Sequence, residues 1–282
     1  MTEAATTADD DLEVLRSAAV AAGIIAAGFF RHAMKTWTKE NASPVSEADI
    51  TVDRYLRATL MAARPGYGWL SEEAVDDFSR LGRRRVFIVD PIDGTRGFIR
   101  GEDSWTISLA VVEDGLPLCG VVYAPARDEL FEAARGGGAR CNAHPLVRQR
   151  LGEAAPVIPG PGAVHDELKA GGLDYVRGPY LPSLAYRLVQ VATGGFDALP
   201  VRRGASDWDV AGAAAILSEC GISFIDACGG PVRFNRRDTR HGPLAAAADD
   251  SLKAVLQDAL VRVYGCPPES AVAASDLESR IP

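Results

Sequence analysis

The chain has 282 residues, 47% of them hydrophobic and 24% charged, which is ordinary for a globular protein with a substantial core. Its net charge of −8 argues against a general nucleic-acid binder, because such proteins usually present a basic surface. The longest apolar stretch, residues 17–30, is too short to span a bilayer and no secretory signal opens the sequence, so we expect a cytoplasmic protein without a membrane segment.

The first part of the chain predicts two helices. Residues 1–10 are polar and rich in Ala and Thr, so we expect them to be disordered. Apolar residues recur at helical spacing over residues 11–31, which indicates a helix with one buried face. A second helix is predicted over residues 46–63, with Ser46 as its N-cap, and the stretch RPGYGW ends it.

The middle of the chain is rich in predicted strands. Strands are expected over residues 86–89, 105–112, 118–123 and 129–134, the second and third being joined by the hairpin signal EDGLP. A Gly- and Pro-rich stretch, residues 151–162, is the candidate domain boundary.

Helices and strands alternate after this boundary. Helices are expected over SLAYRLVQVATGG and DVAGAAAILSECG, strands over ISFIDA and PLAAAA, and a last helix from Asp250 to about Val263. We therefore predict a mixed α+β or α/β protein. Its expected parts are a disordered N-terminus (1–10), an α+β domain (11–150), a smaller α/β domain (151–265) and a loose tail (266–282).

The cysteines and histidines give no sign of catalytic pairing. The five cysteines are an odd number without a CxxC motif, so we expect reduced, structural thiols at Cys119, Cys141, Cys220, Cys228 and Cys266. His144 and His241 lie beside Pro or Gly in predicted loops, and we assign no chemistry to either.

The stretch DPIDGT follows the predicted strand 86–89. Asp90 stands where α/β proteins usually bind ligands, and the turn would bring its carboxylate close to that of Asp93 and to the Ile92 carbonyl. Oxygen ligands of this kind suit Mg²⁺, Mn²⁺ or Ca²⁺ better than zinc or copper. The backbone N–H groups of Gly94 and Thr95 would be placed to hold a phosphate. The alternative is a plain acidic turn.

Further acids recur elsewhere in the chain, each with an ordinary explanation of its own. Glu72 and Glu73 follow two apolar residues, as in many solvated turns. Asp49 and Asp209 each lie near the start of a predicted helix, where the helix dipole favours an acid in any case. Only their joint order along the chain suggests a shared site.

Asp49, LSEE, DPIDGT, GVVYAP and WDVAGA, in this order and spacing, resemble the inositol monophosphatase superfamily of magnesium-dependent, lithium-sensitive phosphomonoesterases. The resemblance covers residues 11–263 and implies a layered αβαβα sandwich. It also implies two or three Mg²⁺ ions, for which Mn²⁺ would substitute, inhibition by Li⁺, a small-molecule phosphate ester as substrate and a homodimer.

The resemblance assigns roles to the residues that match its motifs. Glu72, Asp90, Asp93, Asp209 and the Ile92 carbonyl would bind metal. Thr95 and Asp49 would orient and deprotonate the attacking water, with Glu73 near them. The N–H groups of Gly94 and Thr95 would bind the phosphate. Magnesium ions would neutralise the ester, activate water and stabilise the leaving oxygen.

Two other classes remain as alternatives. Haloacid-dehalogenase-type phosphatases also place a DGT turn after an apolar strand, but their acids are two apart, whereas Asp90 and Asp93 are three apart. A non-catalytic metal-binding module would need no water-activating pair such as Thr95 and Asp49.

The substrate is less clearly indicated. Inositol phosphatases typically carry an acid about seven residues before the aspartate of the WD motif, and counting back from Asp209 gives Arg202 in this chain. Arg187 falls where bacterial 3'(2'),5'-bisphosphate nucleotidases tend to carry a lysine. Arginines bind phosphate with a planar fork, so we predict adenosine 3',5'-bisphosphate as substrate, with Tyr186 or Tyr180 stacking on adenine. Inositol-1-monophosphatase or histidinol-phosphate phosphatase activity, with the arginines as solvated surface charges, stays open.

Overall fold

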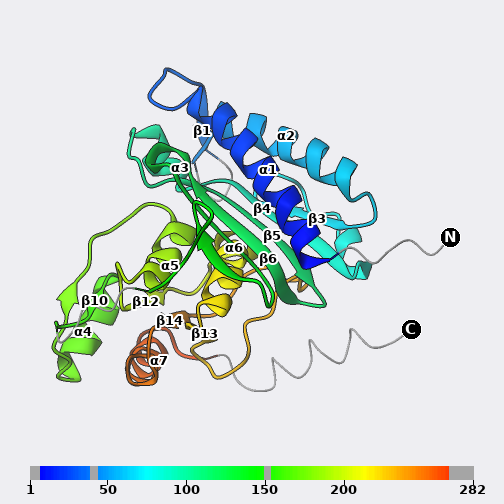
Figure 1. Ribbon diagram of the computed structural model, residues 1–282. Coiled ribbons are helices and arrows are strands. Elements are labelled where there is room, and N and C mark those ends of the chain that lie inside the picture. The colour runs from blue at the N-terminus through cyan, green and yellow to red at the C-terminus, as the bar shows by residue number, and fades with distance from the viewer. Residues whose placement is uncertain (1–6, 39–43, 149–153, 267–282) are drawn as a thin grey trace.

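The computed structural model of the chain describes residues 7–38, 44–148 and 154–266. Layers of helix, sheet, helix, sheet and helix follow one another through the molecule (Figure 1). One apolar core lies between the first helix layer and the large sheet, a second between that sheet, the third layer and the small sheet, and a third between the small sheet and its outer helices. The predicted αβαβα sandwich is therefore confirmed.

The first layer consists of α1 (Ala8–Ala27) and α2 (Glu47–Ala63). The helix α1 begins earlier than expected, because Thr7 and Asp10 cap it reciprocally, each side chain bonding to the other's backbone N–H. Residues 8–10 are thus helical rather than disordered, while residues 1–6 lie outside the described ranges.

The second layer is a seven-stranded sheet in which β3 and β4 are parallel and every other neighbouring pair is antiparallel. Helices cover both faces of β4, which explains its continuous apolar run in place of an alternating pattern. In sheet order the strands are β3 (Gly68–Ser71), β4 (Arg85–Asp93), β5 (Thr106–Glu113), β6 (Leu116–Ala124), β7 (Glu129–Ala134), β8 (Gly138–Cys141) and β9 (His144–Pro145).

The third layer consists of α5 (Leu184–Thr193) and α6 (Asp207–Glu219), which pack on the opposite face of this sheet. Two glycines let α6 approach closely. A Cβ on Gly212 would lie 2.9 Å from the Ser108 Oγ, and one on Gly120 would lie 2.4 Å from the Gly212 carbonyl. This close approach places the start of α6 beside the end of β4.

The fourth and fifth layers are a small antiparallel sheet and its outer helices. The sheet has the order β12 (Ala198–Val201), β14 (Leu244–Ala247), β13 (Ser223–Asp226), and the helices are α4 (Gly162–Ala170) and α7 (Asp250–Tyr264). Shorter elements complete the fold: β1 (Thr36–Thr38), β2 (Pro44–Ser46), η1 (Ser79–Gly82), α3 (Thr95–Ile99), η2 (Pro125–Arg127), β10 (Val157–Ile158) and β11 (Val176–Arg177).

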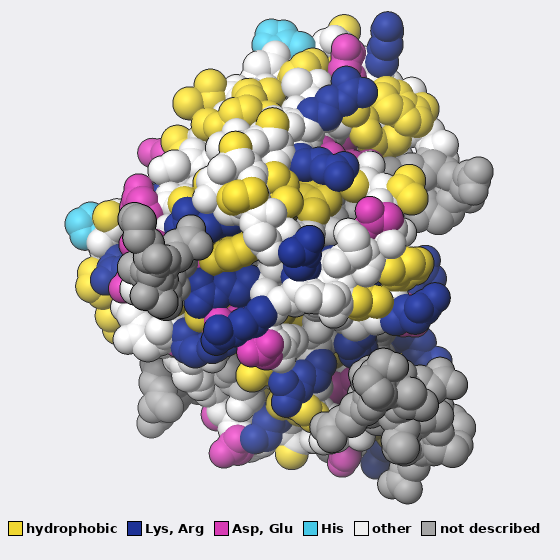
Figure 2. Space-filling view, turned by 90° about the vertical axis from the view of Figure 1, so that its right-hand side faces the viewer, with side chains coloured by type: hydrophobic (Ala, Val, Ile, Leu, Met, Phe, Trp, Pro, Cys, Tyr) yellow, Lys and Arg dark blue, Asp and Glu magenta, His cyan; other side chains and the backbone are white. Residues whose placement is uncertain are grey.

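The predicted division near residue 150 stays a prediction. Residues 149–153 lie outside the described ranges, and one hydrophobic cluster contains residues from both sides of the boundary, such as Val122 and Phe131 with Leu188 and Ile216. None of the helices in the described ranges combines the length and the apolarity needed to cross a bilayer. Despite the overall negative charge, Figure 2 shows Lys and Arg side chains gathered across the middle of one face.

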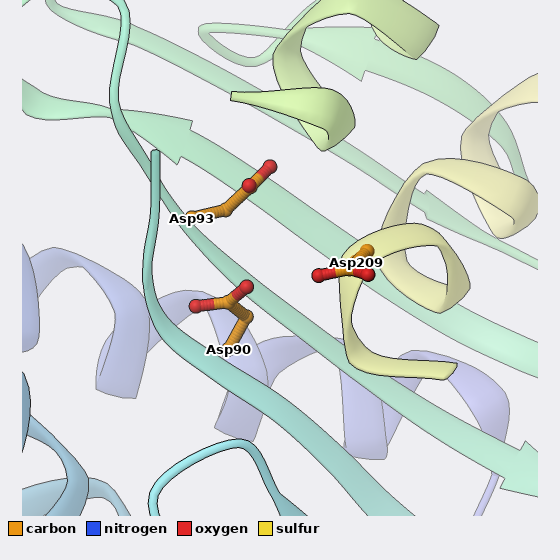
Figure 3. A group of neighbouring side chains, drawn as sticks. All are labelled: Asp90, Asp93 and Asp209. Carbon is orange, nitrogen blue, oxygen red and sulfur yellow. The ribbon is translucent and has the colours of Figure 1, made fainter. Parts of the chain in front are cut away.

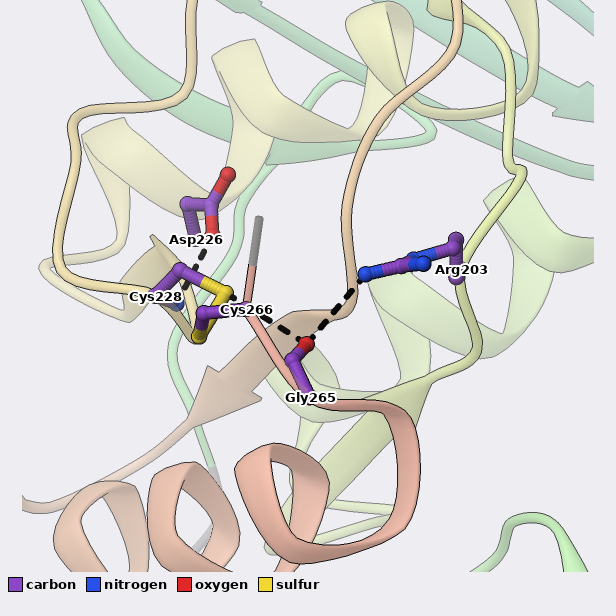
Figure 4. Close-up of a disulfide and its surroundings, with 5 residues drawn as sticks. All are labelled: Arg203, Asp226, Cys228, Gly265 and Cys266. Carbon is purple, nitrogen blue, oxygen red and sulfur yellow. Dashed lines mark hydrogen bonds between the residues drawn. A yellow bond between two sulfur atoms is a disulfide. The ribbon is translucent and has the colours of Figure 1, made fainter. Parts of the chain in front are cut away.

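One expectation about the cysteines is wrong. Cys228, in the turn after β13, forms a disulfide with Cys266, just after α7 (Figure 4). The two are 38 residues apart, so their spacing gave no signal of pairing. Cys119, Cys141 and Cys220 are free thiols whose pKa values burial raises, which makes them poor nucleophiles. The predicted loose tail lies, apart from Cys266, outside the described residues.

Candidate active site

A β-bulge at the end of β4 determines how its two acids point. Asp90 pairs with Ser108 and Asp93 with Thr106, so three residue steps on β4 oppose two on β5. In a regular strand, side chains three residues apart face opposite sides of the sheet. The extra residue of the bulge brings the two carboxylates to one side. Pro91 is tolerated here because a bulge frees its position from the ladder.

Asp209 completes a cluster with these two acids. It lies in the first turn of α6, and one oxygen from each of Asp90, Asp93 and Asp209 lies within 4.8 Å of the others. Figure 3 shows the carboxylate of Asp209, from α6, facing the two acids at the end of β4. The strand end and the helix start therefore supply acids to one point from two layers of the fold.

The electrostatics of this cluster fit a divalent cation. Burial, followed by repulsion from Glu72, raises the pKa of Asp90 well above its usual range, and burial and Asp93 do the same for Asp209. Within the described ranges no ion pair joins the three acids to a Lys or Arg. Buried carboxylates without such partners need a cation to stay ionised together. An all-oxygen set of this kind suits Mg²⁺.

Glu72 and Glu73 follow β3 and lie close to the cluster. The parallel register pairs Ser71 with Val89, and the Glu72 N–H donates to the Val89 carbonyl at 3.2 Å. Glu72 thus comes beside Asp90 at the same end of the sheet. Its charge helps to raise the pKa values of Asp90, Asp209 and Asp49, while Glu73 contributes a smaller effect at Asp90.

Asp49 and Thr95 form a hydrogen-bonded pair beside the cluster. The Thr95 hydroxyl lies 3.0 Å from the Asp49 Oδ1 and 3.0 Å from the Ile92 carbonyl, so its one proton is shared between two acceptors. The other Asp49 oxygen accepts from the Ser46 N–H at 2.8 Å and from its hydroxyl at 2.6 Å. Burial is the main cause of the raised pKa of Asp49.

Asp49 and Asp209 occupy equivalent helix positions. In SEAD the Ser46 side chain and Asp49 form a capping box, and in SDWD Ser206 and Asp209 form another. Each box uses one carboxylate oxygen and thereby fixes the side chain. Asp49 and Asp209 therefore cap their helices, as the ordinary explanation says, and they also lie at the candidate site.

Gly94 and Ser183 join the DPIDGT turn to α5. Gly94 has a φ of +91°, and a Cβ there would lie 3.0 Å from the Ser183 nitrogen, so a side chain is excluded on two grounds. One oxygen of Asp93 accepts from the Ser183 hydroxyl and from the Ala185 N–H, both at 2.6 Å. The turn therefore sets the start of α5, and with it the position of Arg187 one turn later.

A cavity of about 600 Å³ opens beside Asp209. Four arginines from different parts of the chain line it, and the sequence pointed to only two of these, Arg187 and Arg202. The other two are Arg96 and Arg177. Burial lowers the pKa of Arg187, while the carboxylate of Asp93 opposes that effect, so Arg187 connects the cavity electrostatically to the cluster.

Of the two candidate tyrosines, only Tyr180 lines the cavity. Its side chain is 72% exposed, and the Arg187 guanidinium lies 5.5 Å from its ring centre. Tyr186 is 3% exposed and donates its hydroxyl to Glu129 at 2.6 Å. Successive helix residues point about 100° apart, so when Arg187 faces the cavity Tyr186 faces the sheet. Tyr186 is therefore not available to stack on a substrate.

Sequence reasoning missed several further residues around the site. Arg96 follows DPIDGT directly and could have been suspected, whereas nothing marked Arg177 in its short strand. His241, to which we assigned no chemistry, is buried and lies 2.8 Å from the Asp207 Oδ1. Asp207 itself is fully buried two residues before Asp209.

Comparisons with known proteins agree with this geometry. The chain is 37% identical over 205 residues to the inositol-1-monophosphatase of Rhizobium meliloti, covering 68% of this chain and 75% of the relative. It is 32% identical to the histidinol-phosphatase of Mycobacterium tuberculosis (69% and 79% covered) and 28% identical to the 3'(2'),5'-bisphosphate nucleotidase of Aggregatibacter actinomycetemcomitans (76% and 84%).

A solved structure and a family model extend these similarities over most of the chain. The crystal structure of the extragenic suppressor protein suhB from Bartonella henselae superposes with a TM-score of 0.74 at 28% identity, covering 88% of this chain and 97% of that one. The model of the inositol monophosphatase family matches residues 8–263. The chain therefore belongs to the inositol monophosphatase family.

Proposed function

We propose that this chain is a Mg²⁺-dependent phosphomonoesterase for a small ester that carries a second anionic group. The observation that supports this most directly is the juxtaposition of an all-carboxylate cluster with a cavity lined by four arginines. The cluster suits the metal-assisted cleavage of one phosphate, and the arginines suit a further anion on the same substrate.

The residues of the cluster would divide the work as follows. Glu72, Asp90, Asp93 and Asp209, with the Ile92 carbonyl, would hold two or three Mg²⁺ ions. Bound Mg²⁺ would neutralise the phosphate and activate a water molecule. Mn²⁺ is the expected substitute and Li⁺ the expected inhibitor, on the basis of the family.

The Thr95–Asp49 pair would orient the attacking water and accept its proton. The raised pKa of Asp49 makes it a stronger base than an ordinary aspartate, and its fixed second oxygen limits its movement. Glu73 would assist from beside the cluster. The backbone N–H groups of Gly94 and Thr95, at the start of α3, lack intrahelical acceptors and would bind the phosphate.

We infer that adenosine 3',5'-bisphosphate is the best substrate, with AMP and phosphate as products. Arg187 and Arg202 would bind the 5'-phosphate, and Tyr180 would stack on the base in the place first expected of Tyr186. Arginines would repel the cationic amine of histidinol phosphate, which disfavours that substrate. Inositol 1-phosphate is the second candidate, because the relative with that activity is 37% identical.

Initial rates on these three esters, with purified protein and Mg²⁺, test the proposal. We expect the highest kcat/KM for the bisphosphate. Equal kcat/KM values for the bisphosphate and inositol 1-phosphate would refute the substrate assignment alone. A protein that binds Mg²⁺ but cleaves none of a broad set of phosphate esters would instead be a metal-binding module.

Two further expectations rest on the family alone and are proposals for this chain. Li⁺ should inhibit phosphate release. Sedimentation velocity should show a homodimer. Neither result bears on the substrate, so each is tested separately from the rate comparison.

A further inference from the structure

Arg80 is a fully buried cation outside the carboxylate cluster. Its side chain is 0% exposed, and its hydrogen bonds within the described residues go to two loops. In its own loop it donates to both oxygens of Asp76, at 2.8–3.1 Å. In the other loop it donates to the Asn235 Oδ1 at 2.6 Å and to the Arg236 carbonyl at 2.9 Å. A buried guanidinium is costly unless it is paired in this way, so these contacts are fixed features of the fold.

Arg80 closes the loop that carries Glu72 and Glu73. This loop leaves β3, and η1 then folds back over the beginning of the same strand. A Cβ on Gly68 would lie 3.0 Å from the Arg80 Cα, so the two segments are in close contact. Asp76 holds the middle of the loop to Arg80. The loop carrying the two glutamates is therefore anchored to Arg80.

The loop of Asn235 is in turn tied to the start of α6. The Asn235 N–H donates to the Asp207 Oδ2 at 2.7 Å, and the Asp207 N–H donates to the Thr239 carbonyl at 2.9 Å. His241 Nε2 lies 2.8 Å from the other Asp207 oxygen. Asp207 is two residues before Asp209. Hydrogen bonds thus run without a break from Asp76 through Arg80 and Asn235 to the helix that presents Asp209.

This network of hydrogen bonds connects the segments that carry Glu72 and Asp209, which the large sheet does not hold together. The sheet register fixes Glu72 beside Asp90, but Asp209 comes from α6 in the next layer. Glu72 and Asp209 repel each other, since the charge of Glu72 raises the pKa of Asp209. We propose that Arg80 and Asn235 are positioning residues, which hold the Glu72 loop and Asp209 at the separation that Mg²⁺ requires. The proposal rests on the Mg²⁺ binding proposed above.

Calorimetric titration of metal-free protein with Mg²⁺ tests this role without substrate. Asn235→Gly removes the one side-chain acceptor that this loop offers to Arg80, and because residue 235 has a φ of +57°, glycine adopts its backbone without strain. We expect its Kd for Mg²⁺ to rise about tenfold, as for other residues that orient metal ligands. Asn235→Asp keeps the acceptor oxygen and should stay within about twofold of wild type.

The matched control is Asn142→Gly. Asn142 also has a positive φ, +48°, and its side chain bonds to the Leu130 N–H and the Asp128 carbonyl. It follows β8, four strands from β4 and roughly 19 Å across the sheet. We expect unchanged Mg²⁺ binding in this variant. At saturating Mg²⁺ the kcat of Asn235→Gly should return to near the wild-type value, because no residue that would contact the substrate has changed.

The outcomes separate the two proposals. Wild-type Mg²⁺ affinity in Asn235→Gly, in a protein that releases phosphate, would overturn the positioning role and leave the proposed function standing. Equal loss of affinity in Asn142→Gly would also overturn it, since the effect would then be general. No Mg²⁺ binding by the wild-type protein would refute both.

Discussion

The carboxylate cluster and the arginine-lined cavity are neighbours, yet they are built differently. Asp90 and Asp93 of the cluster and Asp49 beside it are no more than 8% exposed, and a strand end, a bulge and a helix cap fix their side chains. Arg96, Arg177 and Arg202 are exposed. The cluster thus belongs to the layered core, while much of the cavity wall belongs to loops and short elements. We infer that the fold determines the reaction and that the cavity wall determines the substrate.

The largest effect should come from the cluster itself. Asp90→Asn keeps the size of the side chain but removes one charge from the cation site, so activity should fall on the order of 10³-fold toward every phosphate ester. Measured rates on the bisphosphate and on inositol 1-phosphate check this. A loss confined to one substrate would contradict the division between cluster and cavity.

A smaller general loss is expected at Thr95. Thr95→Ala removes the hydroxyl that bonds to Asp49, and kcat should fall about 10²-fold because the attacking water loses its orientation. Thr95→Ser retains the hydroxyl and should retain most of the activity. Calorimetry should show Mg²⁺ binding near the wild-type affinity in both variants, and a matching loss of affinity in Thr95→Ala would assign Thr95 to the metal site instead.

The cavity predicts a selective effect. Arg202→Glu should lower kcat/KM for the bisphosphate about tenfold or more, because it replaces an attractive charge with a repulsive one, and should change inositol 1-phosphate turnover little. Arg203→Glu is the matched control, since the side chain of Arg203 donates to the Gly265 carbonyl instead (Figure 4). Equal effects of the two variants would show that general surface charge, not the cavity, is responsible.

The smallest effect is on stability. In the metal-free protein Asp90, Asp93 and Asp209 repel one another, so bound Mg²⁺ should stabilise the fold by about 2.7 kcal/mol at a concentration of 100 Kd. For a chain of this length that corresponds to a rise in Tm of about 5–10 °C. Differential scanning calorimetry measures it. Asp90→Asn should show a smaller rise, and an equal rise would place Mg²⁺ elsewhere.

The sequence was informative where short motifs act locally. DPIDGT, SEAD and SDWD each predicted a turn or cap, and their order along the chain indicated the family and its fold. The bulge that turns Asp93 back toward Asp90 was not foreseen, because it depends on pairing with β5. The bond between Arg80 and Asn235 joins residues 155 apart, and the Cys228–Cys266 disulfide spans 38 residues, so no local pattern marks either. Tyr186 was predicted to stack on the substrate, but it is buried against the sheet because adjacent helix residues face different directions.

The most direct test of the central claim is phosphate release by the wild-type protein before and after Mg²⁺ is added to the metal-free form. With adenosine 3',5'-bisphosphate as substrate, we predict no measurable release without metal and full activity once Mg²⁺ is restored. Phosphate release that is equal with and without Mg²⁺ would contradict the account, because the clustered carboxylates would then have no part in the reaction.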